Sequence, residues 1–330
     1  MSDMETLMMQ DMDFSDYYEE TETAANVLCA SEYLDALKES VRKRHKENRV
    51  FLPWEKVNPY FEFRPGEVTL WAGQNGHGKS QVTDMVKLSL MGQEQKVGNA
   101  SFEMKPVTNL RRMARMYMGQ NPFSDLFAGS PDALQVIDDL FEEFCAWAKG
   151  RLFMFNQQGD VDPRKVVGFV RYCAKELKLD HIFVDNLAKS IRNEDDYNEQ
   201  KAFMGTMCSI AHDYGCHIHV VHHLKKPSGG ETAKPDKYDV KGSGSLTDQP
   251  DNIWLVWRNK PKEEARKNGK QDKDLEPDCI LYNRKQRNYE GDADNNEPTV
   301  ALWLDAPSLQ FLHEKGVAPM FFPNYPHRQS

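Results

Sequence analysis

The sequence lacks the features of a membrane or secreted protein. No apolar run approaches the roughly 18 residues needed to cross a bilayer. The first 25 residues carry eight acids and no Lys or Arg, whereas a secretory signal starts with basic residues. These absences predict a soluble protein of the cytoplasm with no membrane partner.

Paired cysteine motifs are also missing. Six cysteines are scattered through 330 residues, and no two of them form a CxxC pair. A disulfide framework needs dense and regularly spaced cysteines in a short secreted chain. The spacing therefore predicts reduced thiols and an intracellular environment.

A strong positive charge is absent as well. The net charge is −9, and the 25-residue start accounts for eight of the 51 acids. The remaining residues carry 42 bases against 43 acids (51 minus 8). Net charge therefore neither supports nor excludes nucleic acid, and any nucleic-acid footprint must be a local patch.

Composition divides the chain into four parts. Residues 1–30 are acidic and show little periodicity, so we expect a disordered tail. Residues 31–50 predict a linker helix that starts at an N-cap serine, Ser31. Its narrow apolar stripe needs a partner, either on its own domain or on a neighbouring subunit. We expect one domain over residues 51–316 and a short tail at 317–330.

Alternating strand and helix patterns predict the fold of this domain. Four short apolar runs, separated by helix-length segments, precede a fifth, which indicates a mainly parallel central sheet flanked by helices. Two later runs lie closer together and predict an antiparallel extension. A highly charged segment at 259–278 predicts an exposed loop. The seven runs are Val68–Ala72, Val97–Phe102, His181–Asp185, Ile218–His222, Ile253–Trp257, Cys279–Asn283 and Thr299–Leu304.

The string GQNGHGKS follows the first predicted strand and precedes a predicted helix. In a phosphate-binding loop of the GxxxxGK[ST] pattern, glycines let backbone N–H groups surround phosphates. The lysine reaches the β- and γ-phosphates, and the hydroxyl binds Mg²⁺. We therefore expect ATP, or another NTP or dNTP, with Mg²⁺, bound by Gly73, Gln74, Asn75, Gly76, His77, Gly78, Lys79, Ser80 and Gln81.

Two acids follow neighbouring predicted strands. Asp185 ends the apolar run HIFVD, as expected of a carboxylate that completes the Mg²⁺ shell together with Ser80. Glu103 follows the strand of VGNASFE, where its carboxylate would lie beside the γ-phosphate and polarise water. The simpler interpretation of Glu103 is a solvated acid at the start of the next helix.

Five strings in order make the chain resemble the hexameric replicative helicases, both the DnaB type and the helicase half of short-tailed phage primase-helicases. After GQNGHGKS these are SFEM with an Arg-rich helix, FVDN, VVHHLKKP, KGSGSLTDQPDNIWLVWRN and RKQRNYEG. The resemblance covers roughly residues 50 to 313. It implies a RecA-like P-loop NTPase core that hydrolyses ATP.

In the resembled family, the acid after the second strand is the catalytic base, which favours that role for Glu103. The family's γ-phosphate sensor falls on His223. A zinc cluster is the alternative for this histidine-rich segment, but strand alternation places His222 on the opposite face from the other histidines and no CxxC accompanies them. The residues considered for zinc are Cys216, His217, His219, His222 and His223.

The string Lys285-Gln286-Arg287 carries two cations. Because Lys285 and Arg287 are two residues apart on a predicted strand, their side chains point to the same side and can reach one anion. The resemblance implies that this pair enters the nucleotide site of the next subunit as a trans finger. Arg258 matches another family arginine near the γ-phosphate, although it is also a common kind of exposed strand-end charge.

Two loops are candidates for binding single-stranded DNA. The Gly-rich loop that follows His223 carries several lysines, and a second loop follows Asp185. Rings of this type hold nucleic acid with loops that line the central channel; without the resemblance, a solvated basic loop is equally consistent. The candidate DNA-binding residues are Lys189, Arg192, Lys225, Lys226, Lys234, Lys237 and Lys241.

The sequence therefore predicts an ATP-dependent DNA helicase that unwinds a replication fork. A hexameric ring and 5′→3′ translocation follow from the resemblance. We expect any primase to be a separate protein, and a helicase this compact suits a phage or plasmid origin. The alternatives are a RecA-like recombination or annealing ATPase, and a helicase loader or regulator that uses nucleotide only as a clamp.

Overall fold

The computed structural model describes most of the predicted domain. The described residues are 30–35, 38, 49–121, 131–156, 159, 161–187, 196–225, 233–242, 244–289 and 297–324. The acidic tail before residue 30 and most of the predicted linker helix lie outside them, and Ala30–Tyr33 forms a 3₁₀ turn, η3. Among the described helices, none combines the length and apolar character that a membrane span requires.

One sheet organises the domain. The strands are β1 (Val68–Gly73), β2 (Val97–Ser101), β3 (Leu152–Met154), β4 (His181–Asp185), β5 (His217–His223), β6 (Asn252–Arg258), β7 (Cys279–Gln286), β8 (Thr299–Asp305) and β9 (Gln310–Leu312). Their order is β3-β2-β4-β5-β1-β6-β7-β8-β9. The first six strands in this order are parallel, and β7, β8 and β9 are antiparallel to their neighbours.

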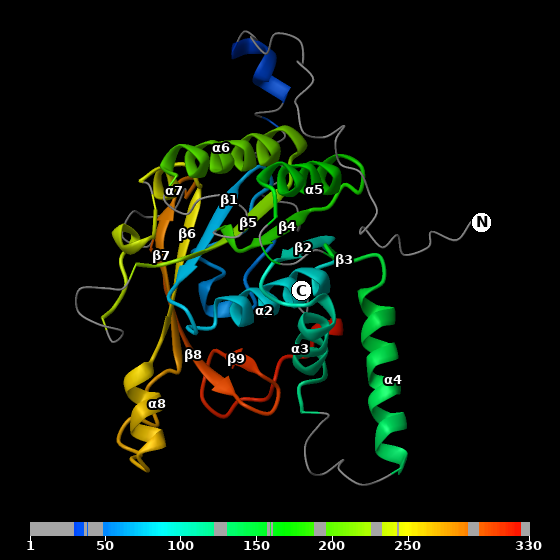
Figure 1. Cartoon of the computed structure of the whole chain (residues 1–330), viewed down its shortest axis with the longest axis vertical. Coiled ribbons are helices and arrows are strands. Elements are labelled where there is room, and N and C mark those ends of the chain that lie inside the picture. The colour runs from blue at the N-terminus through cyan, green and yellow to red at the C-terminus, as the bar shows by residue number, and fades with distance from the viewer. Residues whose placement is uncertain are drawn as a thin grey trace.

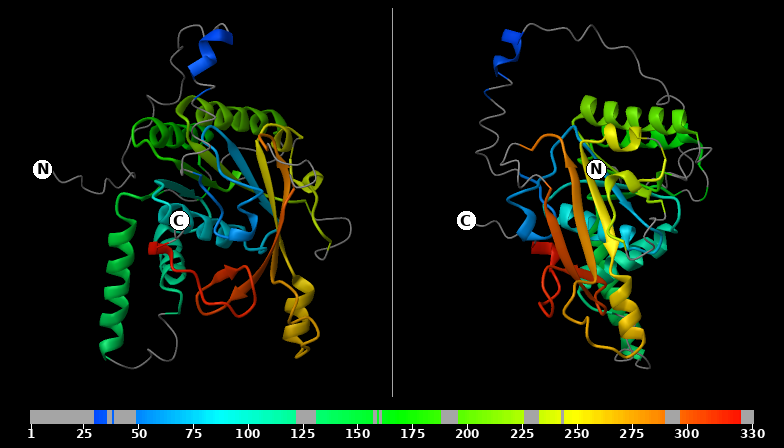
Figure 2. Two further views of the ribbon diagram at one scale, coloured as in Figure 1. Left: turned by 180° about the vertical axis from the view of Figure 1, so that it is seen from behind. Right: turned by 90° about the vertical axis from the view of Figure 1, so that its left-hand side faces the viewer.

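Helices cover the sheet on both faces (Figure 1). On one face lie α5 and α6, and on the other α2 and α3, with α4 beside them (Figures 1 and 2). The short α7 precedes β6, and α8 extends beyond the sheet (Figure 2). Their bounds are α2 (Lys79–Gly92), α3 (Pro106–Met118), α4 (Pro131–Ala148), α5 (Pro163–Lys175), α6 (Tyr197–Tyr214), α7 (Ser245–Asp248) and α8 (Lys260–Lys267).

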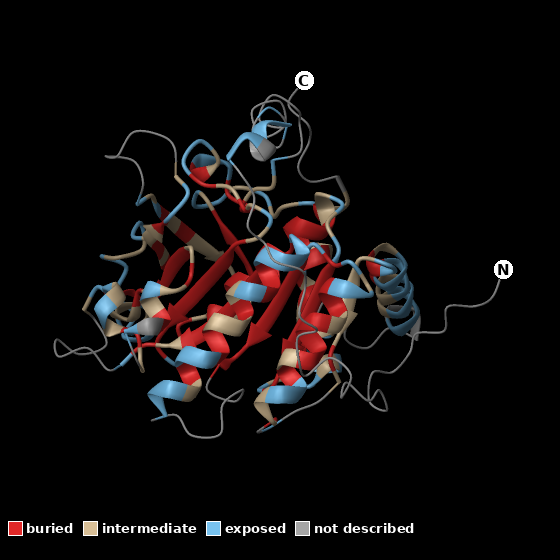
Figure 3. Cartoon of the chain, turned by 90° about the horizontal axis from the view of Figure 1, so that it is seen from above, coloured by how far each residue is buried: buried red, intermediate tan, exposed pale blue. Residues whose placement is uncertain are grey.

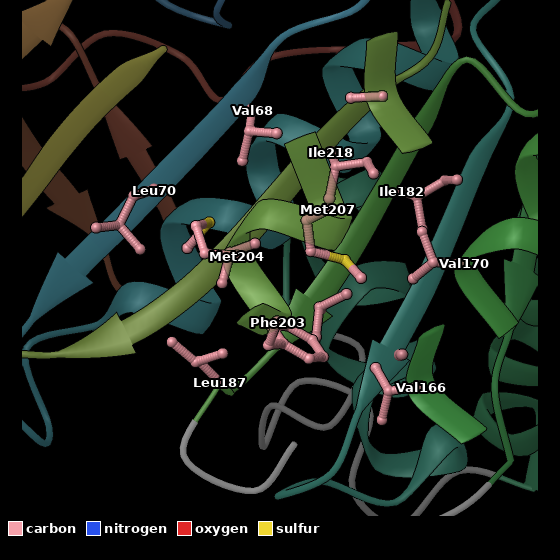
Figure 4. Packing of buried hydrophobic residues seen from close by; sticks show 14 of the residues in the cluster. Val68, Leu70, Val166, Val170, Ile182, Leu187, Phe203, Met204, Met207 and Ile218 are labelled. Atoms are coloured by element: carbon pink, nitrogen blue, oxygen red, sulfur yellow. The ribbon is translucent and has the colours of Figure 1, made fainter. Parts of the chain in front are cut away.

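The central strands are buried on both faces, which is why their sequences are continuously apolar. Figure 3 shows these buried strands behind the half-exposed helices of one face. One cluster packs β1, β4 and β5 against α5 and α6, with Met207 close to Ile218 and Val170 close to Ile182 (Figure 4). A second cluster packs the opposite face against α2 and α3. The sheet is thereby held rigidly between two apolar layers.

The structure confirms the predicted α/β fold with its mainly parallel sheet and antiparallel extension. Each of the seven predicted runs corresponds to a strand whose ends differ from it by at most one residue, except that β7 extends three residues further, to Gln286. Strands β3 and β9 were not predicted, because three residues are too few to show the alternation of apolar and polar residues that marks a strand.

The charged segment at 259–278 is not entirely a loop. It contains α8, whose N-cap Asn259 accepts a hydrogen bond from the backbone of Lys262. The Lys262 side chain is buried and lies 2.9 Å from Asp278. A highly polar composition therefore concealed a capped helix with a buried ion pair.

Candidate nucleotide-binding site

The residues predicted to contact nucleotide lie in a row at the carboxyl ends of the parallel strands. Neighbouring strands β2, β4, β5, β1 and β6 end, in that order, at or within two residues of Glu103, Asp185, His223, Gly73 and Arg258. This is the edge at which open α/β sheets bind ligands. Residues far apart in the sequence are thus brought into one row.

The phosphate loop turns directly from β1 into α2. Gly78 is the N-cap residue of α2, and its φ of 85° is a left-handed conformation that favours glycine. Gly73 approaches β6 so closely that an added Cβ would lie 2.7 Å from the Val256 carbonyl oxygen. The N-terminus of α2 therefore presents its backbone N–H groups and positive dipole end to the loop, as anion binding requires.

Lys79 is held inside the loop by polar contacts. Its Nζ donates to the carbonyl oxygens of Gly73 at 2.9 Å and Gln74 at 3.1 Å, and lies 3.1 Å from Nδ1 of His223. Burial lowers the pKa of Lys79 to about 8, while the charges of Asp185 and Glu103 act in the opposite direction. A phosphate beside this ammonium group would favour its charged form.

Ser80 and Asp185 are in direct contact. The Ser80 Oγ donates to Oδ2 of Asp185 at 2.8 Å. Burial raises the pKa of Asp185, and the nearby carboxylates of Glu103 and Asp84 raise it further, while Lys87 and the Ser80 hydrogen bond lower it. A hydroxyl and a carboxylate oxygen at this place are the hard ligands that Mg²⁺ prefers.

Glu103 is linked to His223 through a residue that we did not predict. Asn186 directly follows Asp185, and its side-chain amide donates to Oε1 of Glu103. The same amide nitrogen lies 2.8 Å from Nε2 of His223, and Glu103 Oε1 lies 3.7 Å from that ring nitrogen. The string FVDN contained this residue, but sequence alone gave no reason to separate it from any other polar residue after a strand.

A buried network of charged and polar side chains joins α2 to α3. Asp84 is fully buried and contacts Lys87 at 3.0 Å, Asn109 at 2.8 Å and the guanidinium of Arg112. Arg112 also donates to the Ser80 carbonyl oxygen at 3.1 Å. Burial alone raises the pKa of Asp84, but the charges of Arg112 and Lys87 outweigh it, so this pKa lies below its usual value. The network ties the start of α2 to α3.

Two further residues of the loop segment, His77 and Gln81, have protein partners. The backbone N–H of Arg258 donates to Nδ1 of His77 at 3.2 Å, and the Arg258 guanidinium contacts Glu263. Arg258 therefore lies against His77 of the phosphate loop. The Gln81 side chain donates to the Leu309 carbonyl oxygen at 2.7 Å, which connects α2 to the antiparallel end of the sheet.

Lys285 and Arg287 lie at the opposite edge of the sheet, because β7 runs antiparallel to β6 and ends beside α7 (Figure 1). Lys285 Nζ donates to the carbonyl oxygens of Thr247 at 2.9 Å and Asp248 at 2.6 Å. Arg287 donates to the Asp248 carbonyl at 2.8 Å and contacts Asp251 at 3.2 Å. Both cations thus converge on residues 247–251, although Arg287 lies just past the end of β7.

The base of the predicted DNA loop pairs directly with the end of β5. Leu224 and Val240 form an antiparallel bridge, and the Lys241 N–H donates to the His223 carbonyl oxygen at 3.0 Å. Nε2 of His222 lies 2.7 Å from the Lys241 carbonyl oxygen. Of the candidate DNA-binding residues, Lys225, Lys234, Lys237 and Lys241 are described, whereas Lys189, Arg192 and Lys226 lie outside the described residues.

Most of the histidine-rich segment belongs to the core. The ring of His219 stacks on Phe183 with centroids 3.9 Å apart, and the Thr69 hydroxyl lies 2.8 Å from Nε2 of His217. Burial lowers the pKa of both histidines and raises that of the Cys216 thiol to about 12. Across the described residues, no three His, Cys, Asp or Glu side chains gather in a way that could hold a metal ion.

Solved structures share this fold. An ATPase domain, solved as a separate domain, superposes with a TM-score of 0.68 and 13% identity, covering 87% of this chain and 99% of that one. A DnaB-like replicative helicase, solved with attention to its interactions with primase, gives a TM-score of 0.66 and 13% identity over 88% of this chain and 68% of that one. These similarities confirm the predicted RecA-like fold, in the form found in DnaB-like helicase ATPase domains.

Sequence comparison points the same way. The Twinkle homolog protein, chloroplastic/mitochondrial, of Arabidopsis thaliana is 22% identical over 228 residues. The match covers 66% of this chain, and the chain spans about a third (32%) of that relative's length. The AAA domain family model matches residues 55–229, more than half of the 330 residues, and this range contains the phosphate loop, Glu103, Asp185 and His223. The prediction of an NTP-hydrolysing domain is confirmed, and the chain belongs to the AAA domain family.

Proposed function

We propose that the chain is a ring-forming, Mg²⁺- and ATP-dependent DNA helicase that translocates 5′→3′ on single-stranded DNA and unwinds duplex at a replication fork. The observation that carries this proposal is that the groups expected to bind nucleotide and the two cations expected to act as a finger lie at opposite ends of the strands. The phosphate loop and Glu103 lie at one edge of the sheet, and Lys285 and Arg287 lie at the other.

The nucleotide half supplies binding and activation of water. Backbone N–H groups at the start of α2 hold the phosphates, and Lys79 donates to the β- and γ-phosphate oxygens. Ser80 and Asp185 would hold the Mg²⁺ ion, which neutralises charge on the transferred phosphoryl. Glu103 orients the attacking water and accepts its proton, and His223 contacts the γ-phosphate.

The second half has to come from a neighbour. The phosphate loop and the start of β1 are five residues apart, or about 16 Å at roughly 3.3 Å per residue. Arg287 lies at the far end of that span, because its backbone N–H bonds Asp251, whose N–H bonds Val68. Its side chain is therefore too distant to serve its own nucleotide. In a ring, Arg287 and Lys285 would enter the site of the next subunit.

Coupling to DNA follows from the base of the loop after β5. The His223 side chain would face the nucleotide. Its backbone carbonyl oxygen accepts a hydrogen bond from the backbone N–H of Lys241, at the other end of the loop. Loss of a γ-phosphate contact at His223 would move both ends of the loop together. Lys225, Lys234, Lys237 and Lys241 would then shift with the DNA backbone they hold.

The proteins with a similar fold are consistent with this proposal. One is a replicative helicase described with its primase, and another is an ATPase domain. We infer that this chain also acts with a separate primase and other replication proteins. The linker helix of residues 31–50 would dock on the adjacent subunit of the ring.

A strand-displacement assay tests the proposal. Forked DNA with a free 5′ tail, ATP and Mg²⁺ should be unwound, and DNA with only a 3′ tail should not. Lys79→Ala is the control for nucleotide-dependent activity. Strand annealing or exchange without unwinding would instead favour a recombination ATPase. Nucleotide binding without turnover in the presence of DNA would favour a loader or regulator.

A further inference from the structure

The short helix α7 connects the loop after β5 to the start of β6, and it lies beside the end of β7 (Figure 1). The carbonyl oxygens of Thr247 and Asp248 accept hydrogen bonds from Lys285 Nζ. Those of Asp248 and Gln249 accept from one terminal nitrogen of Arg287, at 2.8 and 3.2 Å. We propose that α7 positions both cations for the neighbouring nucleotide site and links their position to the DNA held by the loop. This inference rests on the proposed function and extends it.

The two cations need such a partner because they repel each other. Burial lowers the pKa of Lys285, and the charge of Arg287 lowers it further, whereas the carboxylates of Asp248 and Asp251 act in the opposite direction. The last carbonyl groups of a helix lack partners inside the helix and favour nearby cations. The carbonyl groups at the end of α7 therefore offset the repulsion at the place where both side chains lie.

Asp251 fixes the direction of the Arg287 guanidinium. Its Oδ1 lies 3.2 Å from Nη1 of Arg287, and its Oδ2 accepts from the backbone N–H of Val68 at 2.9 Å. The Asp251 side chain is 14% exposed, whereas the Arg287 side chain is 50% exposed. The guanidinium is thus anchored on one side and open on the other. A phosphate of the next subunit can contact the open side while the anchor stays in place.

Close packing joins α7 to the end of the loop. Gly242 has a φ of 110°, and a Cβ added there would collide with the Gln200 side-chain oxygen and lie 2.9 Å from Leu246. Leu246 is a fully buried residue of α7. The Gly244 carbonyl oxygen accepts from the backbone N–H of Thr247 at 3.0 Å. A shift of the loop end therefore moves α7, together with the carbonyl groups that hold the cations.

The consequence concerns two subunits at once. DNA held by the loop of one subunit sets the position of Lys285 and Arg287, which act on the ATP bound by its neighbour. Stabilisation of charge on a transferred phosphoryl group depends strongly on the geometry of the donors. A displaced guanidinium therefore lowers the rate of hydrolysis and leaves nucleotide binding nearly unchanged.

Asp251→Asn tests the anchor. The amide oxygen can still accept from the Val68 N–H, but the NH₂ group then faces Arg287, which is also a donor. With saturating oligo-dT, kcat for ATP should fall by about 10- to 100-fold, and binding of a fluorescent nucleotide should change by less than about threefold. Unchanged kcat would overturn the inference.

Asp180→Asn is the matched control. The Asp180 carboxylate also accepts a hydrogen bond from a backbone N–H at the start of a strand, that of Lys96 at 2.8 Å. It lies beside β2 and β4, on the other side of β1 from β7. This variant should keep kcat within about twofold of wild type. A loss equal to that of Asp251→Asn would show that any such anchor at this edge suffices, and would overturn the inference.

Mixed rings separate a positioning role from a merely structural one. A subunit with Asp251→Asn keeps its phosphate loop, and a subunit with Lys79→Ala supplies an undisturbed Arg287. Turnover should therefore recover when the two variants are mixed, whereas a general defect in the Asp251→Asn subunit would not be repaired by a neighbour. Absence of recovery, in mixtures where Arg287→Ala does recover, would overturn the inference.

A pair of glycine variants tests the link to DNA, and it decides the inference if Asp251→Asn does not fold. Gly242→Ala should lower the stimulation of kcat by saturating oligo-dT by about 10-fold, because the added Cβ displaces the loop end from α7. Gly244→Ala should stay within about twofold of wild type, since a Cβ there meets only Asp248 Oδ2 at 3.9 Å. Wild-type stimulation in Gly242→Ala would overturn the inference.

The same measurements distinguish this inference from the proposed function. If Arg287→Ala is inactive and recovers in mixed rings, while Asp251→Asn and Gly242→Ala behave as wild type, the inference fails alone. If Arg287→Ala keeps full DNA-stimulated turnover, the trans finger of the proposed function fails and the inference fails with it.

Discussion

Lys79 and Arg287 lie at opposite edges of one sheet in the same subunit. Lys79 follows the carboxyl end of β1, and Arg287 bonds Asp251 beside the amino ends of β1 and β6. The sheet between them is about 16 Å long at roughly 3.3 Å per residue. The sheet keeps these groups apart, so within one subunit Arg287 does not reach the nucleotide site that we propose around Lys79.

The role proposed for Glu103 can be tested by replacing its carboxylate with an amide of the same shape. Glu103→Gln keeps the side-chain shape but cannot accept a proton from water. We expect kcat for ATP to fall by about 10²- to 10⁴-fold, with nucleotide binding retained. Steady-state turnover with single-stranded DNA, together with binding of a fluorescent nucleotide, measures both. Wild-type turnover in this variant would remove Glu103 from the mechanism.

Asp84 should be important for stability. Asp84→Asn leaves Lys87 and Arg112 without their buried counter-charge, which typically costs about 3–5 kcal/mol. Urea unfolding of the nucleotide-free protein measures the change. Asp213→Asn on the exposed end of α6 is the matched control and should change stability by less than about 0.5 kcal/mol. A similar small effect at Asp84 would show that the network contributes little.

Buried histidines should make the fold sensitive to acid. Burial lowers the pKa of His217 and of His222 to about 4, below the roughly 6.5 of an unfolded chain. Between these values the unfolded state binds more protons than the folded state. Stability should therefore be unaffected above about pH 6.5 and fall as the pH drops towards 4, by about 1.4 kcal/mol per unit per histidine.

Urea unfolding across this pH range measures that slope. His217→Gln should reduce the slope, because the variant lacks one of the buried rings. His212→Gln, at a largely exposed position on α6, is the matched control for the loss of a histidine. A slope that His217→Gln leaves unchanged would contradict the assignment of acid sensitivity to this ring.

The lysines after β5 should contribute to DNA binding through phosphate contacts. Replacing Lys234 and Lys237 by alanine should weaken binding of single-stranded DNA equally for all sequences. It should also reduce the dependence of log K on log salt by up to about 1.4, or about 0.7 for each lost contact. Fluorescence anisotropy at several salt concentrations checks this. Lys270→Ala, in the exposed segment after α8, is a charge-matched control, and an equal loss there would contradict the loop assignment.

The sequence predicted the sheet well because its buried strands are continuous apolar runs with a polar residue at the end. It also predicted the groups at those ends, since a shared edge follows from parallel strands. Asn186 and the pairing of Lys262 with Asp278 could not be predicted, because they depend on which distant side chains meet. The register shift in the β6–β7 pairing between Ile253 and Trp254 likewise follows no local sequence pattern.

A mixing experiment tests the central claim that each site is shared between two subunits. Arg287→Ala alone and Lys79→Ala alone should each lose DNA-stimulated ATP hydrolysis, the first while still binding nucleotide. Mixed rings contain sites in which an intact phosphate loop faces an intact Arg287, so their turnover should recover to a fraction set by the mixing ratio. Mixed rings that assemble but show no recovery at any ratio would contradict a trans role for Arg287.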